Sequence, residues 1–264
     1  MSISRRTALV AGASVPMAST LAACQQEEQT GVPGPVNEKS APGARQGRLA
    51  FRPPSQPKSA EGRTGRFTMT GADGSPPAEL YVPAFDDREP LRLVVMFHGA
   101  GGVAQNAVGR LQREAESYRL LLLAPQSTSS TWDVLTGGYG PDVRNLDRLL
   151  AQVAAAYPLR GYTIGGFSDG ASYALSMGIG NGDVFDSVIA YSPGFEAAEL
   201  SNGRPRFFVS HGTADQVLPI DRCSRRIVPA LEEAGYDVTY HEFKGGHAVP
   251  DRIQRKAVDW LNAR

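Results

Sequence analysis

Short hydrophobic runs separated by polar segments recur along the chain from about residue 67 onward. Several of these runs are continuously apolar, which is typical of parallel strands buried on both faces. The pattern predicts eight strands: Phe67–Thr70, Leu80–Val82, Leu91–Phe97, Leu120–Ala124, Tyr162–Phe167, Val188–Tyr191, Phe207–Ser210 and Val238–Phe243.

Between these runs, hydrophobic residues recur at spacings of three and four, which indicates amphipathic helices. The clearest case is Asp142–Tyr157, where such spacings separate Val143, Leu146, Leu150 and Val153. Further helices are predicted at Ala104–Tyr118, Ser168–Met177, Ile220–Ala234 and Pro250–Ala263. Alternating strands and helices predict an α/β fold: a mostly parallel central sheet with helices on both faces.

The amino-terminal edge of this sheet is predicted to differ from the rest. An Asp-Gly-Ser-Pro turn joins the strands 67–70 and 80–82, which favours an antiparallel pair at the sheet edge. Upstream, Leu49 and Phe51 alternate with arginines, so 48–52 is a candidate additional edge strand. We therefore expect one domain spanning residues 47–264, with its start the least certain boundary.

Residues 1–23 have the layout of a secretory signal. Arg5 and Arg6 precede an uncharged stretch rich in small and apolar residues. Residues 4–9 resemble a twin-arginine export signal. Leu21-Ala22-Ala23-Cys24 resembles a bacterial lipobox, which implies cleavage before Cys24 and lipidation of that cysteine. The alternatives are an ordinary cleaved signal or a buried amino-terminal helix.

A polar segment follows Cys24. Residues 25–46 are dominated by Gln, Glu, Pro, Gly and Ser, and such a composition cannot bury enough apolar surface to offset its ordering entropy. We interpret 24–46 as a lipidated cysteine with a flexible tether. The predicted product is a bacterial lipoprotein, exported and anchored to a membrane on its periplasmic or cell-surface side.

Composition narrows the functional classes. The 264 residues contain 27 Lys and Arg against 27 Asp and Glu, and this balance argues against a nucleic-acid-binding protein. The two cysteines cannot form a disulfide framework, and the chain contains no spacing typical of a zinc site. Neither a phosphate-binding G-x-x-x-x-G-K-[ST] loop nor an H-E-x-x-H motif occurs.

The motif Gly166-Phe167-Ser168-Asp169-Gly170 is the leading candidate for chemistry. It is a G-x-S-x-G sequence that follows an apolar strand and opens a predicted helix, the context of a nucleophile elbow. Because a serine hydroxyl needs a general base, and that base an orienting acid, partners are required downstream. The simpler alternative is that Ser168 only caps the helix.

Two loops downstream provide these partners. Asp215 follows the strand 207–210, and His247 lies in a glycine-flanked loop after the last strand. Glu196 is the alternative acid. The remaining histidines have structural interpretations: His98 and His211 as hydrogen-bonding residues at strand ends, and His241 as a residue packed within a strand.

The order Ser168, Asp215, His247, each in a loop after a strand, resembles the α/β-hydrolase superfamily over residues 48–264. The resemblance is greatest to small carboxylesterase/phospholipase-like and polyester-depolymerase-like serine esterases without a large lid domain. His98-Gly99-Ala100-Gly101-Gly102 resembles the family's oxyanion loop, which implies oxyanion donors at the backbone amides of Ala100 and Asp169.

The same loop has a second interpretation as a dinucleotide fingerprint, Gly99-x-Gly101-x-x-Ala104. That fingerprint needs an acidic residue at the end of the next strand, where this chain has Ala124-Pro125-Gln126. The cofactor interpretation is therefore disfavoured.

The sequence thus predicts a monomeric serine esterase that needs no cofactor or metal and acts on a small-molecule or polymer ester. Trp132, Tyr139 and Phe195 are candidate pocket residues, although packing is the more common role of such aromatic side chains. The alternatives are a peptidase or polyester depolymerase with the same triad, or a non-catalytic ligand-binding lipoprotein on the same fold.

Overall fold

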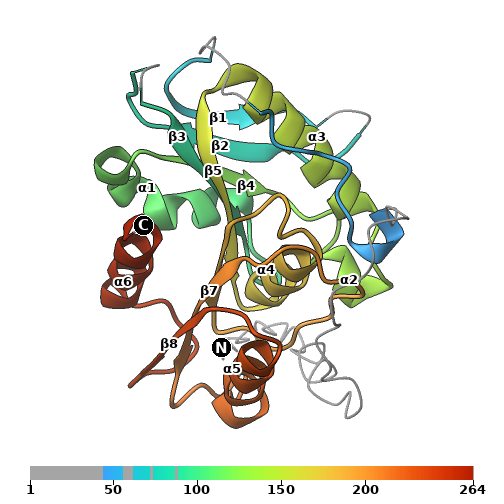
Figure 1. The fold of residues 1–264 in the computed structure, drawn as a ribbon, viewed down its shortest axis with the longest axis vertical. Coiled ribbons are helices and arrows are strands. Elements are labelled where there is room, and N and C mark those ends of the chain that lie inside the picture. Colours follow the sequence, from blue (N-terminus) through green and yellow to red (C-terminus); the bar gives the residue numbers. More distant parts are fainter. Residues whose placement is uncertain (1–43, 56–61, 72–73, 87–88, 264) are drawn as a thin grey trace, which may run out of the picture.

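The computed structural model describes residues 44–55, 62–71, 74–86 and 89–263, so the predicted signal and Cys24 lie outside the described residues. Eight strands form one sheet: β1 (Gly65–Met69), β2 (Ala78–Val82), β3 (Leu91–Phe97), β4 (Leu120–Pro125), β5 (Leu159–Phe167), β6 (Ser187–Tyr191), β7 (Arg206–Gly212) and β8 (Val238–Phe243). Their order across the sheet is β1-β2-β4-β3-β5-β6-β7-β8 (Figure 1).

Strand direction divides the sheet into two parts. β1 pairs with β2, and β2 with β4, in antiparallel fashion, so the predicted antiparallel edge is present. All other neighbours are parallel. The carboxyl ends of β3, β5, β7 and β8 therefore meet at one edge of the sheet, where ligands bind in open α/β folds.

The helices are α1 (Ala104–Tyr118), α2 (Asp133–Thr136), α3 (Pro141–Ala156), α4 (Asp169–Gly180), α5 (Ser224–Glu233) and α6 (Asp251–Asn262), with short 3-10 turns η2 (Ala44–Gln46) and η3 (Ile220–Arg222). The predicted helix 220–234 is interrupted at Cys223, whose backbone (φ −117°, ψ −106°) separates η3 from α5. The short α2 was not predicted.

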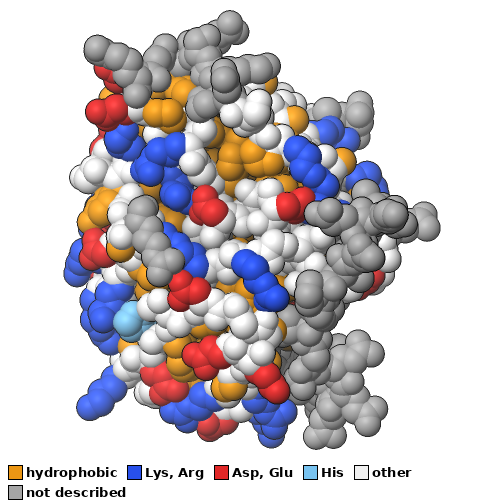
Figure 2. Space-filling view, in the orientation of Figure 1, with side chains coloured by type: hydrophobic (Ala, Val, Ile, Leu, Met, Phe, Trp, Pro, Cys, Tyr) orange, Lys and Arg blue, Asp and Glu red, His pale blue; other side chains and the backbone are white. Residues whose placement is uncertain are grey.

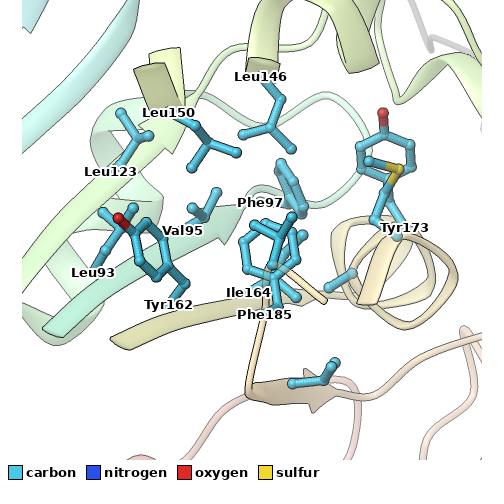
Figure 3. Close-up of a cluster of buried hydrophobic side chains, with 14 of the residues drawn as sticks. Leu93, Val95, Phe97, Leu123, Leu146, Leu150, Tyr162, Ile164, Tyr173 and Phe185 are labelled. Carbon is cyan, nitrogen blue, oxygen red and sulfur yellow. The ribbon is translucent and has the colours of Figure 1, made fainter. Parts of the chain in front are cut away.

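Two hydrophobic clusters hold these layers together. Helices α1 and α6 cover one face of the sheet, and α3, α4 and α5 cover the other (Figure 1). Figure 3 shows the cluster on the face covered by α3 and α4, in which Leu146 and Leu150 of α3 lie with Val95 of β3 and Ile164 of β5. Helix α4 is buried from Gly170 to Gly180, which explains its small, uncharged sequence.

The prediction of a strand at 48–52 is wrong. The backbone amide of Leu49 donates to the side chain of Asn181 (2.8 Å), and that of Phe51 donates to Asp147 (2.8 Å). Side chains therefore take the place of a neighbouring strand. The alternation instead reflects burial, because the Leu49 side chain is only 1% exposed and belongs to the main core.

Leu49→Ala is expected to lower the free energy of unfolding by about 2–5 kcal/mol, the usual cost of truncating a buried leucine. The neighbouring Arg48 pairs with Asp183 and so holds this segment in place. We therefore expect the space left by the truncated leucine to stay unfilled. Urea denaturation would measure the change, with the exposed Gln46→Ala as control. Equal stability of the two variants would show that the domain begins after this segment.

On the face shown in Figure 2, acidic and basic side chains are interspersed. Among the described residues, no helix has both the length and the apolar character needed to cross a membrane.

Candidate active site

Ser168 occupies a sharp turn between β5 and α4. Its backbone angles, φ 58° and ψ −124°, are rarely adopted by residues other than glycine. Two glycines permit this turn. A Cβ at Gly166 would overlap the carbonyl oxygen of Gly170, and a Cβ at Gly170 would overlap the carbonyl oxygens of Phe97 and His98. The G-x-S-x-G pattern is therefore a packing requirement, and the turn places Ser168 at the carboxyl edge of the sheet.

Gly170→Ala is expected to destabilise the protein by about 1–3 kcal/mol through overpacking. Because relief of the clash must shift the turn that carries Ser168, any activity that depends on Ser168 is expected to fall by about 10²-fold. Gly109→Ala is the matched control, since Gly109 lies on the exposed side of α1 and a Cβ there would meet no atom within 4 Å. That control is expected to stabilise the helix by up to about 1 kcal/mol and leave activity unchanged.

His247 connects Ser168 to Asp215. Its Nε2 lies 2.8 Å from Ser168 Oγ, and its Nδ1 lies 2.7 Å from Asp215 Oδ2. An ionised carboxylate only accepts hydrogen bonds, so Nδ1 carries the ring proton and Nε2 is left to accept from the serine hydroxyl. The Asp215 side chain is fully buried, whereas that of His247 is 15% exposed.

The loop that carries His247 is held against the end of β7. A Cβ at Gly212 would meet the carbonyl oxygen of Gly245, so the two chain segments touch through their backbones. The amide of Thr213 also donates to the carbonyl of Phe243 (2.8 Å). The positions of His247 and Asp215 are thereby coupled through backbone contacts.

Further contacts fix the Asp215 carboxylate. Oδ1 accepts from the backbone amides of Val217 and Leu218, both at 2.9 Å. Oδ2 lies 3.3 Å from Nε2 of His211, which is fully buried and also donates to the Leu218 carbonyl (2.8 Å). His211 Nδ1 in turn accepts from the hydroxyl of Ser224 (2.7 Å). His211 therefore has the structural role expected of it, but it also supports the acid.

Burial lowers the pKa of His211 in the folded protein. Below the ordinary histidine pKa of about 6.5, the unfolded chain binds a proton that the folded chain resists, so stability falls on acidification. The His211→Gln variant is expected to lose less stability than wild type between pH 7 and pH 5. Urea denaturation at both values measures this difference, and an equal loss in both proteins would contradict it.

The loop after β3 approaches the serine from the other side. A Cβ at Gly99 would lie 3.2 Å from the Cβ of Ser168. His98 fixes the loop because its Nδ1 donates to the Gly99 carbonyl (2.8 Å) and its Nε2 accepts from the Ser127 amide (3.2 Å). Burial lowers the pKa of His98, which favours this neutral form.

The two amides predicted as oxyanion donors are free to act. Asp169 is the first residue of α4, and Ala100 lies in the turn after Gly99. Neither backbone N–H has an acceptor among the described residues. The Asp169 side chain accepts from the Thr131 hydroxyl (2.8 Å) and makes no hydrogen bond to His247.

Comparison with known structures identifies the architecture. The chain resembles esterase PE8 (25% identity, TM-score 0.57), covering 71% of this chain and 97% of that one. It also resembles the Bacillus cereus carboxylesterase, with 18% identity and a TM-score of 0.58 over 72% of this chain and 95% of that one. A third similar structure is an S-formylglutathione hydrolase from Agrobacterium tumefaciens, with 16% identity and a TM-score of 0.58 over 80% of this chain and 97% of that one. The chain has the α/β-hydrolase fold. Neither a protein-family model nor a curated protein matches the sequence.

In this α/β-hydrolase fold the predicted pocket residues have other roles. The Trp132 ring is 1% exposed and stacks on Tyr173, and its Nε1 donates to the His98 carbonyl (2.9 Å). Tyr139 is buried and donates to the Ala197 carbonyl (2.8 Å). Both therefore belong to the core, and the prediction that they line the pocket is wrong. Through its hydrogen bond to His98, Trp132 holds the loop of residues 98–102 in place.

The other two candidates make no hydrogen bond to Ser168, His247 or Asp215. Phe195 is half-buried, and its amide faces the Ser172 hydroxyl (3.4 Å). Glu196 accepts from the Ala198 amide (3.2 Å) and makes no hydrogen bond to His247. The described residues contain no cluster of His, Cys, Asp and Glu able to hold a metal ion.

A cavity of about 170 Å³ lies beside the oxyanion loop. Gly99 and Ala100 line it from the loop, Phe167 from the elbow, and Arg110 from α1. Neither Arg110 nor Phe167 was predicted to line a pocket. A charged residue on an amphipathic helix ordinarily faces solvent, so the pattern alone contains no signal that α1 turns Arg110 toward a cavity.

Proposed function

We propose that this protein is a serine hydrolase that cleaves carboxylic esters through an acyl-enzyme. The observation that carries the proposal is the continuous hydrogen-bonded path from Ser168 Oγ through His247 to Asp215, built on a strained elbow. These three side chains come from loops separated by up to 79 positions in sequence, and packing alone does not require them to meet.

The proposed reaction begins with attack of Ser168 Oγ on the ester carbonyl carbon while His247 Nε2 takes the hydroxyl proton. The tetrahedral intermediate collapses, the C–O bond to the alcohol breaks, and Nε2 returns the proton to the departing alcohol oxygen. Water then attacks the acyl-enzyme with the same base, which releases the carboxylic acid and restores the Ser168 hydroxyl.

Two features lower the barrier. Asp215 keeps the His247 ring in the tautomer whose Nε2 can accept a proton, and it stabilises the imidazolium that forms. The backbone amides of Ala100 and Asp169 are proposed to donate hydrogen bonds to the carbonyl oxygen as negative charge develops on it. One such donor is typically worth about 2.7–4 kcal/mol of the barrier.

The proposed substrates are small. The adjacent cavity, at about 170 Å³, is below the roughly 300–1,000 Å³ of sites for drug-sized ligands. Only β6, β7 and their connections lie between α4 and Asp215, which leaves no space for a separate lid domain. We therefore expect short acyl groups, on soluble esters or at the surface of a polyester, in preference to long-chain lipids.

The direct test is hydrolysis of a panel of acetyl, butyryl and octanoyl esters, together with peptides and a soluble polyester, by the full-length protein. We expect turnover of the short esters and little of the peptides. Absence of ester turnover, with the protein folded by circular dichroism, would leave the ligand-binding alternative.

We also propose that the enzyme is a lipoprotein held at a bacterial membrane through Cys24. The lipobox-like sequence supports this, and about twenty residues separate it from the first described turn, η2. Cys24→Ala is expected to move the protein from the membrane to the soluble fraction while ester turnover persists. Retention at the membrane would contradict the proposed anchor.

A further inference from the structure

The cavity beside the oxyanion loop contains one charged side chain, that of Arg110. Arg110 is half-buried on α1, and its guanidinium lies 5.0 Å from the ring centre of Phe167. Its side chain makes no hydrogen bond or ion pair with the described residues. A guanidinium that is partly withdrawn from water without a protein acceptor loses part of its hydration, and structures usually pair such groups.

The surroundings of Arg110 supply no compensating anion. Burial lowers the pKa of the Arg110 guanidinium, and the group that favours its charge is the phenol of Tyr191, whose own pKa burial raises. Tyr191 is therefore neutral near pH 7. Glu114, one turn further along α1, instead accepts from the Gln254 amide (3.0 Å). The guanidinium thus keeps its five donors available.

The cavity borders the candidate reaction centre, because Phe167 and Gly99 belong to its lining and also contact the proposed triad. The Phe167 ring contacts both the Arg110 guanidinium and the His247 ring, whose centre lies 4.6 Å away. On the loop side, Gly99 lines the cavity and also approaches Ser168. A small molecule whose carbonyl reaches Ser168 could therefore extend a second group into this cavity.

We infer that Arg110 binds a carboxylate carried by the ester substrate, so that half-esters of short dicarboxylic acids, or esters of short hydroxy acids, are favoured over neutral esters. This inference rests on the proposed function and specifies its substrate class. A planar guanidinium matches a carboxylate in a two-point contact, and the apolar walls from Phe167 and Val103 fit the short carbon chain between the two ends.

The test compares kcat/KM for matched substrates, monomethyl glutarate against methyl butyrate and acetoxyacetate against ethyl acetate. Wild type is expected to prefer the charged member of at least one pair by roughly 10- to 100-fold, the usual worth of a charged hydrogen bond. Arg110→Met is expected to abolish that preference by lowering kcat/KM for the charged member of the pair. Arg110→Lys should restore part of it.

Arg113→Met is the matched control, because Arg113 lies on the same helix but is exposed and paired with Asp251. It is expected to keep the wild-type preference. Equal rates for charged and neutral esters in wild type, or an unchanged preference in Arg110→Met, would overturn the inference. Hydrolysis of neutral esters in the same assay would still support the proposed esterase. Failure of wild type to hydrolyse any ester would instead reject the proposed function.

Discussion

Ser168→Ala is expected to reduce kcat for a short ester by about 10⁶-fold, the loss found when a triad nucleophile is removed. The reason is that no other hydroxyl lies within hydrogen-bond distance of His247 Nε2 among the described residues. The fold should be preserved, because removal of the hydroxyl leaves the elbow backbone and its glycine contacts unchanged. Steady-state kinetics on an acetyl ester would measure the loss.

A matched control is available in the neighbouring loop. Ser129→Ala removes an exposed hydroxyl and is expected to leave kcat within about twofold of wild type. If Ser168→Ala retained more than a few per cent of the activity while its circular dichroism spectrum matched wild type, another residue would have to be the nucleophile.

Asp215→Asn is expected to lower kcat by about 10⁴-fold with little loss of stability. The asparagine can keep its carbonyl oxygen toward the amides of Val217 and Leu218, which leaves its NH₂ group facing His247. A donor at that position forces Nδ1 to accept, so Nε2 carries the proton and can no longer take one from Ser168.

The comparison for this variant is Asp221→Asn, which removes an exposed carboxylate that pairs with Arg225. Surface pairs of this kind contribute little, so we expect wild-type kcat. Equal activity of Asp215→Asn and Asp221→Asn would contradict the role of Asp215 and favour Glu196 as the acid. A large loss in Asp215→Asn together with unfolding would require Asp215→Glu as a second variant.

Much of the fold could be predicted from hydrophobic periodicity. Helix α1 and strands β3 and β8 have the predicted bounds, because each is a continuous run with one pattern. The prediction of a strand at 48–52 failed for a physical reason. Alternating hydrophobic residues show which side chains are buried, but they do not show what the backbone amides bond to. Here those amides donate to the side chains of Asn181 and Asp147. The break at Cys223 has no pattern signal at all.

In the candidate site, the three polar residues could be predicted from the sequence, but the pocket residues could not. Ser168, Asp215 and His247 were predicted together because motif, order and strand context agree, and in the structure their side chains lie within hydrogen-bond distance. Aromatic residues near a site do not show whether they line a pocket or fill the core, which explains the error at Trp132 and Tyr139. The contact of His211 with Asp215 depends on loop geometry that a separation of four positions does not determine.

Labelling with a fluorophosphonate tests most directly whether Ser168 is the nucleophile. Mass spectrometry of the digested protein is expected to find one adduct, on the peptide that contains Ser168. The adduct should be absent in Ser168→Ala and should form far more slowly in His247→Ala, because that variant lacks the proposed general base. No adduct on folded wild-type protein, or an adduct on a different serine, would contradict the assignment of Ser168.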